Sequence, residues 1–120
     1  MSHFSTLRSK LTDAEILKAS LADLGLVSHV DADVRGMCGQ KVRADIVVTL
    51  TGDYDLGWVR NQQGSFDLIA DLWGVAKNHN LANLMSSINQ KYAINKTLAE
   101  VKQPGLQNAK VNFMVQQSVA

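Results

Sequence analysis

The sequence predicts an α+β fold, a two-layer sandwich in which two helices cover one face of a mostly antiparallel sheet. Between residues 44 and 71, three short segments alternate apolar and polar side chains, and turn-forming residues separate them. Two longer segments on either side carry apolar residues at the helical spacing of three and four. Because one face of the three strands is wholly apolar, it needs a cover, and the two helices supply it.

Length and composition indicate one domain, residues 1–120, with a single core, because nearly half of the 120 residues (46%) are hydrophobic. Twelve basic and eleven acidic side chains leave a net charge of +1, too small to indicate nucleic acid or an anionic membrane as a partner. The single cysteine, Cys38, cannot form an internal disulfide, which fits a reducing compartment. No secretory signal opens the chain, and no apolar run approaches the roughly 20 residues that span a bilayer. We therefore expect a soluble cytoplasmic protein.

The N-terminal part predicts a short strand at residues 3–7 and then a helix that begins at Asp13. Thr12 and Glu15 have the spacing of a capping box, in which their side chains satisfy the free amides of a helix start. Gly25 is placed to end the helix in the left-handed conformation. The apolar stripe that faces the sheet consists of Ala14, Leu17, Leu21 and Leu24.

The middle of the chain predicts the strands of the sheet. A strand is expected at 26–31, followed at 31–43 by a loop or an irregular hairpin arm, because two glycines and many charges interrupt any period. Three strands then follow at 44–50, 56–60 and 66–70, joined by tight turns into a meander. Ile46, Val48 and Leu50 share the apolar face of the first.

Residues 72–76 are apolar but contain a glycine, so an irregular connection is expected there. The second helix begins at Asn78 or Asn80, reaches about Lys102 and stops at Pro104-Gly105. Its apolar stripe consists of Leu81, Leu84, Met85, Ile88, Tyr92 and Leu98. A last strand at 110–116 returns to the sheet. The resulting order, β-α-β-β-β-β-α-β, is consistent with a ferredoxin-like arrangement that carries an inserted hairpin.

The residue types that carry chemistry are scattered. His3, His29 and His79 lie far apart and lack the paired spacing of a metal site, so neither a metal nor a cofactor is predicted. Cys38 has no local signature of a nucleophile and is interpreted as a small side chain. Gly36 and the glycine at 39 do not form a phosphate loop, because the Lys-Ser/Thr ending and a preceding apolar strand are both missing.

Acidic residues gather around the meander, and two of them could form an acid/base pair. The structural interpretation is favoured, in which Asp53 and Asp55 shape a turn while Asp45, Asp67 and Asp71 form a solvent-side face.

Aromatic and basic residues of the predicted meander form a candidate interaction surface. Its residues are Lys41, Arg43, Tyr54, Asp55, Trp58 and Arg60. Such mixtures stack on bases and contact phosphates in nucleic-acid-binding sheets. Contact with a protein is favoured over nucleic acid, because only 6% of the residues are aromatic, Trp58 could belong to the core, and an open sheet leaves an edge that can pair with another strand.

Six short motifs, in order, make the chain resemble a known family over nearly its whole length. They are MSHFST (1–6), DLG (23–25), ADIV (44–47), YDLGW (54–58), DLIAD (67–71) and QKYA (90–93). The chain resembles the uncharacterised cyanobacterial and plastid family named hypothetical chloroplast open reading frame thirty-five. The resemblance implies a source in a photosynthetic lineage, or a phage that infects one, and a soluble protein of the cytosol or the plastid stroma. It brings no catalytic residue.

Together these observations favour a small, non-enzymatic protein-binding or assembly module that works through sheet and loop surfaces. A homo-oligomer formed through the open sheet edge is a variant of this interpretation. The alternative is a small-molecule-binding protein or enzyme whose pocket lies between sheet and helices. That pocket would be lined by Trp58, Phe66, Tyr92 and Phe113.

Overall fold

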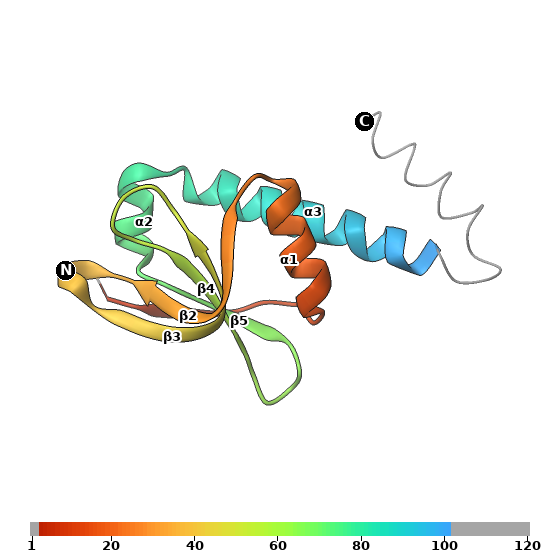
Figure 1. Cartoon of the computed structure of the whole chain (residues 1–120), viewed down its shortest axis with the longest axis horizontal. Helices are drawn as coiled ribbons and strands as arrows, with labels where there is room; N and C mark the ends of the chain where they lie inside the picture. Colours follow the sequence, from red (N-terminus) through yellow and green to blue (C-terminus); the bar gives the residue numbers. More distant parts are fainter. Residues whose placement is uncertain (1–2, 102–120) are drawn as a thin grey trace.

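The computed structural model describes residues 3–101, which form one five-stranded sheet with helices packed against it (Figure 1). The strands lie in the order β1-β5-β4-β3-β2, and every neighbouring pair is antiparallel. In chain order the elements are β1 (Ser5–Arg8), α1 (Ala14–Asp23), β2 (Val27–Arg35), the 3-10 turn η1 (Met37–Gly39), β3 (Lys41–Thr49), β4 (Leu56–Arg60), β5 (Phe66–Ala70), α2 (Leu72–Asn78) and α3 (Leu81–Val101).

The predicted α+β class is confirmed, with the opening strand, the first helix, the meander and the long second helix in their expected places. The helix stop at 104–105 and the last strand at 110–116 lie outside the described residues. The ferredoxin-like arrangement needs that last strand, so it stays a prediction.

Short polar side chains cap the N-termini of the two long helices, α1 and α3. In α1 the carboxylate of Asp13 accepts a hydrogen bond from the amide of Ile16 (3.1 Å), so Asp13 is the N-cap and the capping role predicted for Thr12 is wrong. Gly25 follows the helix with a φ of 75°, as predicted. In α3 the side chain of Asn80 accepts from the amide of Asn83 (3.1 Å), which confirms Asn80 as a helix start.

Residues 72–76 belong to a helix, α2, and not to the expected irregular connection. The carboxylate of Asp71 caps it by accepting from the amide of Gly74 (3.1 Å). Gly74 is needed for packing, because a Cβ there would lie 2.0 Å from the ring of Tyr54. A glycine that the sequence presents as a helix breaker therefore lets a neighbouring ring approach the helix.

Residues 31–43 are mostly strand, so of the two expected alternatives the loop is wrong and the hairpin arm is what the structure shows. β2 runs to Arg35 and β3 starts at Lys41, and the two strands are paired in register up to that last pair. The tight turn between them holds Cys38 and Gly39 at φ values of 55° and 77°. The charges of this segment alternate with apolar residues along the paired strands, so the pattern is that of a hairpin with one solvent-facing side.

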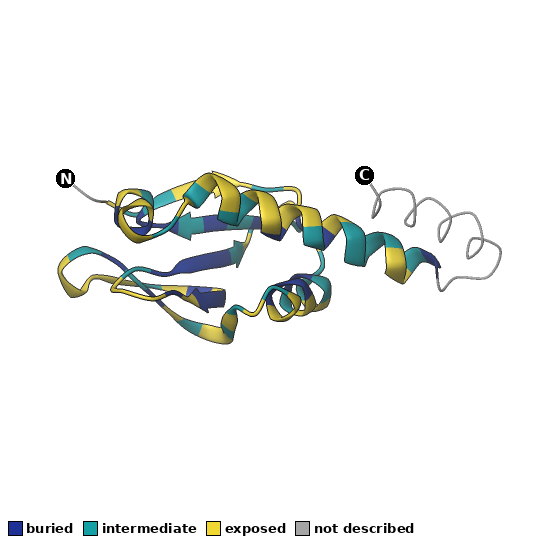
Figure 2. Cartoon of the chain, turned by 90° about the horizontal axis from the view of Figure 1, so that it is seen from above, coloured by how far each residue is buried: buried dark blue, intermediate teal, exposed yellow. Residues whose placement is uncertain are grey.

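The predicted apolar face of the meander is covered by helices, as expected. Ile46, Val48 and Leu50 are at most 6% exposed. Figure 2 shows the buried residues concentrated on the central strands, while α3 alternates mainly intermediate and exposed positions along its length. The helical side chains buried against this face are Leu17 and Leu21 of α1, Val75 of α2, and Ile88 and Tyr92 of α3.

The opposite face is covered by the chain's own β2–β3 hairpin. The half of the hairpin next to η1 folds over the sheet, so that Val34 and Ala44 pack with Val47 in a second small core. Asp31, between the two halves of β2, has a φ of 48°, which marks the change of direction. Gly57 makes the packing possible, because Val34 occupies the space that a side chain at position 57 would need.

Substitution of Gly57 by alanine should therefore destabilise the fold. The added Cβ would lie 2.3 Å from Cγ2 of Val34 and 3.0 Å from Cβ of Ala44. Overpacking of this kind costs about 1–3 kcal/mol, which urea unfolding would measure as a lower free energy of unfolding. In a Val34→Ala background the nearest methyl group is gone, so the same substitution should cost less. An equal cost in both backgrounds would contradict the proposed packing.

Candidate functional site

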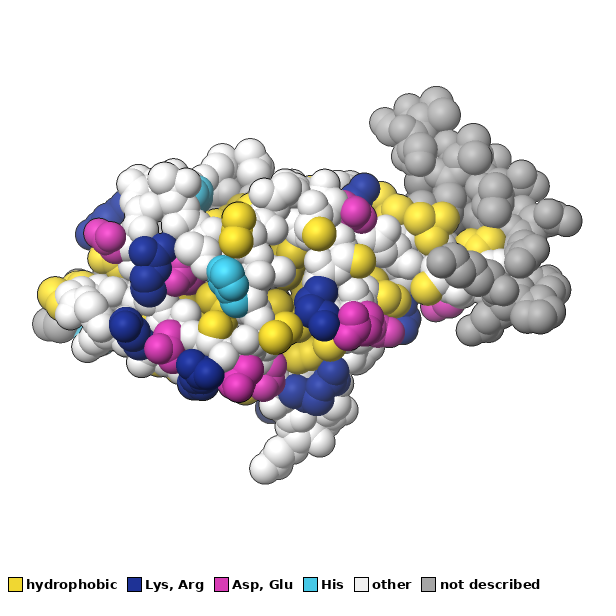
Figure 3. All heavy atoms as spheres, viewed as in Figure 1, with side chains coloured by type: hydrophobic (Ala, Val, Ile, Leu, Met, Phe, Trp, Pro, Cys, Tyr) yellow, Lys and Arg dark blue, Asp and Glu magenta, His cyan; other side chains and the backbone are white. Residues whose placement is uncertain are grey.

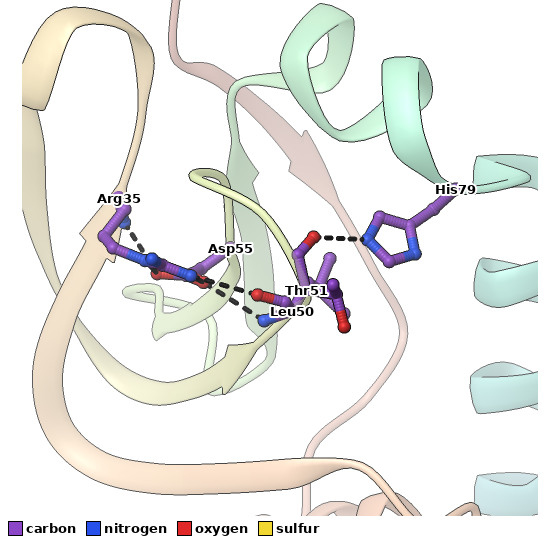
Figure 4. Close-up of polar contacts among 5 residues, drawn as sticks. All are labelled: Arg35, Leu50, Thr51, Asp55 and His79. Atoms are coloured by element: carbon purple, nitrogen blue, oxygen red, sulfur yellow. Dashed lines mark hydrogen bonds and ion pairs between the residues drawn. The ribbon is translucent and has the colours of Figure 1, made fainter.

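The tip of the hairpin is held by a buried carboxylate, that of Asp55 at the start of β4. Figure 4 shows Arg35 and Leu50 converging on it. One carboxylate oxygen accepts from the amide (3.0 Å) and Nε (2.8 Å) of Arg35, and the other accepts from Nη2 of Arg35 (2.8 Å) and the amide of Leu50 (3.2 Å). Asp55 is 2% exposed, and its own amide donates to the carbonyl of Arg35 (3.2 Å). The ion pair thus joins the hairpin to the β3–β4 loop.

The environment of Asp55 favours its ionised form. Burial alone would raise the pKa of this carboxyl, but hydrogen bonds from the Arg35 side chain and from the amides of Arg35 and Leu50, together with the charge of Arg35, outweigh burial and lower it. The same contacts raise the pKa of Arg35, mainly through its hydrogen bonds to Asp55. A carboxylate in this state anchors a loop and is a poor proton donor at neutral pH.

Asp71 ties the hairpin tip to α2. It is 1% exposed, so its predicted place on a solvent-side face is wrong. While one oxygen caps α2, the other accepts from the amide of Met37 in η1 (3.3 Å). Beside these contacts lies a hollow of about 270 Å³, lined among others by Arg35, Cys38, Lys41 and Tyr54. Both buried aspartates therefore accept hydrogen bonds from backbone amides.

The histidines do not form a site. Nε2 of His79 lies 3.0 Å from the carbonyl of Thr51 and links the start of α3 to the β3–β4 loop (Figure 4). His3 and His29 are exposed at other places in the fold. Within residues 3–101, no three His, Cys, Asp or Glu side chains come close enough to hold a metal ion.

The six residues of the candidate interaction surface do not share one surface. Trp58 is fully buried and Asp55 almost so, while Tyr54 is half-buried against α2. Lys41 and Arg43 are exposed on β3. The interior position of Trp58 leaves it unavailable for stacking on a base.

The two arginines of this set are engaged in local contacts. Arg43 lies 3.3 Å from carboxylate oxygens of both Asp31 and Asp33. Nη1 of Arg60 donates to the carbonyl of Thr12 (2.9 Å), and its guanidinium lies over the ring of Phe66, 4.2 Å from the centroid. On the face drawn in Figure 3, basic and acidic side chains are interspersed and do not form a basic patch.

A groove lies on the helix-covered side, between the segment around β1 and the helix α3. Its volume is about 730 Å³, and it is lined mostly by apolar side chains. Trp58 and Tyr92, two of the four residues predicted for a pocket between sheet and helices, belong to this lining. Phe66 is in the core and outside the groove, and Phe113 lies beyond the described residues. The sequence does not predict the contribution of residues 7–11, because they form the end of a short strand and the segment after it and carry no motif.

The outer edge of β2 is a second exposed feature. Among residues 3–101, β2 pairs with β3 alone, so its other edge ends the sheet. Val27 and Val30 are each 59% exposed there. None of the described helices combines the length and apolar character needed to cross a membrane.

Comparison with known proteins places the chain among proteins without an assigned activity. The family model described as "Protein of unknown function (DUF1257)" matches residues 20–120. The "Uncharacterized protein ycf35" of Guillardia theta is 34% identical over 106 residues, which are 88% of this chain and 82% of that protein. Proteins of the same name from Pyropia yezoensis and Cyanophora paradoxa are 26% and 23% identical over 89% and 94% of this chain, and 84% and 88% of their own length. No solved structure matches.

Removal of the buried carboxylate should loosen the hairpin tip. In Asp55→Asn the guanidinium of Arg35 loses its charged partner, and we expect the free energy of unfolding to fall by about 2–3 kcal/mol. Asp53→Asn is the matched control, because Asp53 is an exposed acid two residues away and its change should stay within about 0.5 kcal/mol. Chemical denaturation of both variants measures the difference, and similar losses in the two would contradict the anchoring role.

Asp55 should also contribute to acid unfolding. The pKa of Asp55 is lower in the folded chain than the ordinary value of 3.8, so the native state binds fewer protons than the unfolded state. The ionised carboxylate therefore contributes its full stabilisation of the fold above about pH 5. It is lost as the pH falls through 3.8 toward the lower value of the folded state. A plot of unfolding free energy against pH should therefore fall less steeply below pH 5 for Asp55→Asn than for the wild type, and parallel curves would rule this out.

Proposed function

The chain belongs to the DUF1257 family of proteins of unknown function, and from this premise we propose that it is a non-enzymatic protein-binding or assembly module. The resemblance to the plastid family of open reading frame thirty-five is confirmed by the ycf35 relatives. The proposal places the protein in the cytoplasm of a photosynthetic cell, or of a cell infected by its phage, and in the plastid stroma for the algal relatives. The partner is a protein that adds an extended segment to the sheet.

The free edge of β2 is the observation that carries this proposal. Natural edge strands are commonly blunted by charges, proline or bulges, which prevent pairing with other chains. The first four residues of β2, from Val27 to Val30, include neither a proline nor an acidic or permanently basic side chain, and charged residues begin only at Asp31. At the other end of the sheet, β1 has only four residues. The edge of β2 thus offers unpaired backbone groups next to two exposed valines, as strand addition requires.

The contacts of the buried acids support binding over catalysis. Asp55 accepts four hydrogen bonds and Asp71 accepts two, all from structural donors of the hairpin, the β3–β4 loop and α2. Groups engaged in this way hold loops in position, and a general acid or base needs a hydrogen-bonding position open to its substrate. These contacts are consistent with a rigid scaffold that presents an edge.

Charged substitutions at the β2 edge should abolish association while leaving the fold intact. Val27→Lys/Val30→Lys places two ammonium groups on exposed positions, where they oppose strand addition. Leu98→Lys is the control, because Leu98 is also an exposed apolar residue (42%) but lies on α3. In a mild affinity purification from the protein's own cells, wild type and control should retain the same partner, and the double variant should lose at least about nine-tenths of it.

The mass in solution and a cross-link complete this test. A photo-reactive residue at position 30 should attach to the retained partner, and one at position 98 should not. A mass of two chains by light scattering, reduced to one by the double variant, would identify the partner as a second copy. Recovery of the protein alone with the mass of one chain, or full retention of the partner by the double variant, would overturn the proposal.

A further inference from the structure

From the groove beside α3 we infer a second binding site, one for a small anionic amphiphile that has an apolar body and a single carboxylate or phosphate group. The groove lies at the β1 side of the sheet, whereas the proposed partner strand adds to β2 at the other end. The inference therefore stands apart from the proposed protein partner. Three features of the lining carry it: its size and apolar floor, the charges at its rim, and an unpaired indole N–H.

The size and floor of the groove fit one small molecule. Its volume of about 730 Å³ lies within the range of about 300–1,000 Å³ found for ligand pockets. Leu11, Trp58, Leu68 and Tyr92 are buried residues of the core that form its floor, and Met85 lies at the side of α3. An apolar concave lining of this kind is typical of ligand-binding grooves, since an apolar group that binds there leaves water for an apolar surface.

The charges at the rim select an anion. Arg8 and Lys10 come from β1 and the segment after it, and Lys96 comes from α3 on the other side. The lining contains no aspartate or glutamate. Arg8 lies opposite Asp67 in the sheet register, so Lys10 and Lys96 are the cations on which the charge argument rests. Two ammonium groups on opposite sides of an apolar groove are complementary to one acidic head group.

Trp58 adds a polar group that still needs a partner. Its side chain is fully buried, and its Nε1 has no hydrogen-bond acceptor among residues 3–101. Leaving a buried donor unpaired has a free-energy cost that an acceptor removes. Because Trp58 belongs to the lining of the groove, a ligand oxygen bound next to its indole ring would supply that acceptor if the neighbouring side chains move aside. An amphiphile with a polar head group provides both the apolar body and such an oxygen.

Tryptophan fluorescence can report on the site directly. The chain has two tryptophans, and Trp73 is 73% exposed on α2, so Trp73→Phe leaves Trp58 as the only tryptophan, which is excited selectively at wavelengths where tyrosine does not absorb. Titration of this variant with dodecanoate or with dodecyl phosphate, below their micelle concentrations, should change the emission of Trp58 with saturation at one molecule per chain. The two probes separate a carboxylate source from a phosphate source, and saturable binding of either one supports the inference.

Neutral and chain-free probes test whether both parts of the ligand matter. Dodecanol keeps the apolar chain without the charge, and acetate keeps the charge without the chain, so each should bind at least about tenfold more weakly than the better anionic probe. Dodecanol binding as tightly as the anions would overturn the inference, because the cations would then have no role. Absence of a saturable change with both dodecanoate and dodecyl phosphate would overturn it as well.

Variants in the Trp73→Phe background locate the binding. Lys10→Gln/Lys96→Gln should weaken binding about tenfold, since each partly exposed contact between opposite charges is worth a factor of about two to five. Lys91→Gln is the matched control, because Lys91 is on α3 but outside the lining, and it should bind as the parent does. Ala93 is an exposed residue of the lining, so Ala93→Phe should fill the groove and abolish binding without disturbing the core.

Thermal unfolding of each variant, compared with the parent, separates lost binding from lost folding. If the lysine double variant and Ala93→Phe both bind the anionic probe with the affinity of the parent, the inference that the groove is the binding site is overturned. The Val27→Lys/Val30→Lys variant should bind dodecanoate normally, because its substitutions lie at the other end of the sheet. If the amphiphile does not bind, the proposal of strand addition at β2 is unaffected. If no partner is purified, the proposal of amphiphile binding in the groove is unaffected.

Discussion

The ion pair between Arg35 and Asp55 holds the outer half of the β2–β3 hairpin over the second face of the sheet. Its strength comes from geometry, because the guanidinium approaches both carboxylate oxygens at 2.8 Å and two backbone amides complete the shell of donors. The contact fixes the end of β2 next to Val34, which packs with Ala44 over Gly57 in the second small core. Asp71 assists by binding the amide of Met37, so the hairpin tip is fixed at two points.

The folded-back hairpin also explains which parts of the structure the sequence predicts. Ile46, Val48 and Leu50 follow the two-residue period of a strand with one buried face, and the structure buries them. Asn80 and Gly25 follow local rules for helix ends, and they sit where those rules place them. Local patterns are sufficient in each case, because the two-residue period needs no knowledge of which residues cover the face, and the helix ends have partners within a few residues.

Most of the failures have the opposite cause, since they depend on contacts between distant segments. Nothing near Asp55 in sequence indicates that it meets Arg35, which precedes it by twenty residues at the end of the folded hairpin. The alternation of the preceding strand predicts a solvent-side position for Asp71, yet Asp71 caps α2 and accepts a hydrogen bond from the amide of Met37 in η1. From the sequence alone, Gly74 suggests a break in a helix. In the structure it lies within α2, and the ring of Tyr54 occupies the space that a side chain at position 74 would need. Trp58 alternates correctly along β4, but only the structure places it at the floor of a groove.

The same constraint places the two proposed binding surfaces at opposite ends of the sheet. Folding the hairpin inward uses the outer half of β2, so only Val27 to Val30 remain as an edge that a partner strand can reach. At the other end β1 is short and α3 runs past it, and a groove that Leu11 and Trp58 help to line remains between them. Because strands β5, β4 and β3 separate the two positions, an extended protein segment at β2 and an amphiphile at the groove do not compete for space. One small sheet therefore has room for both.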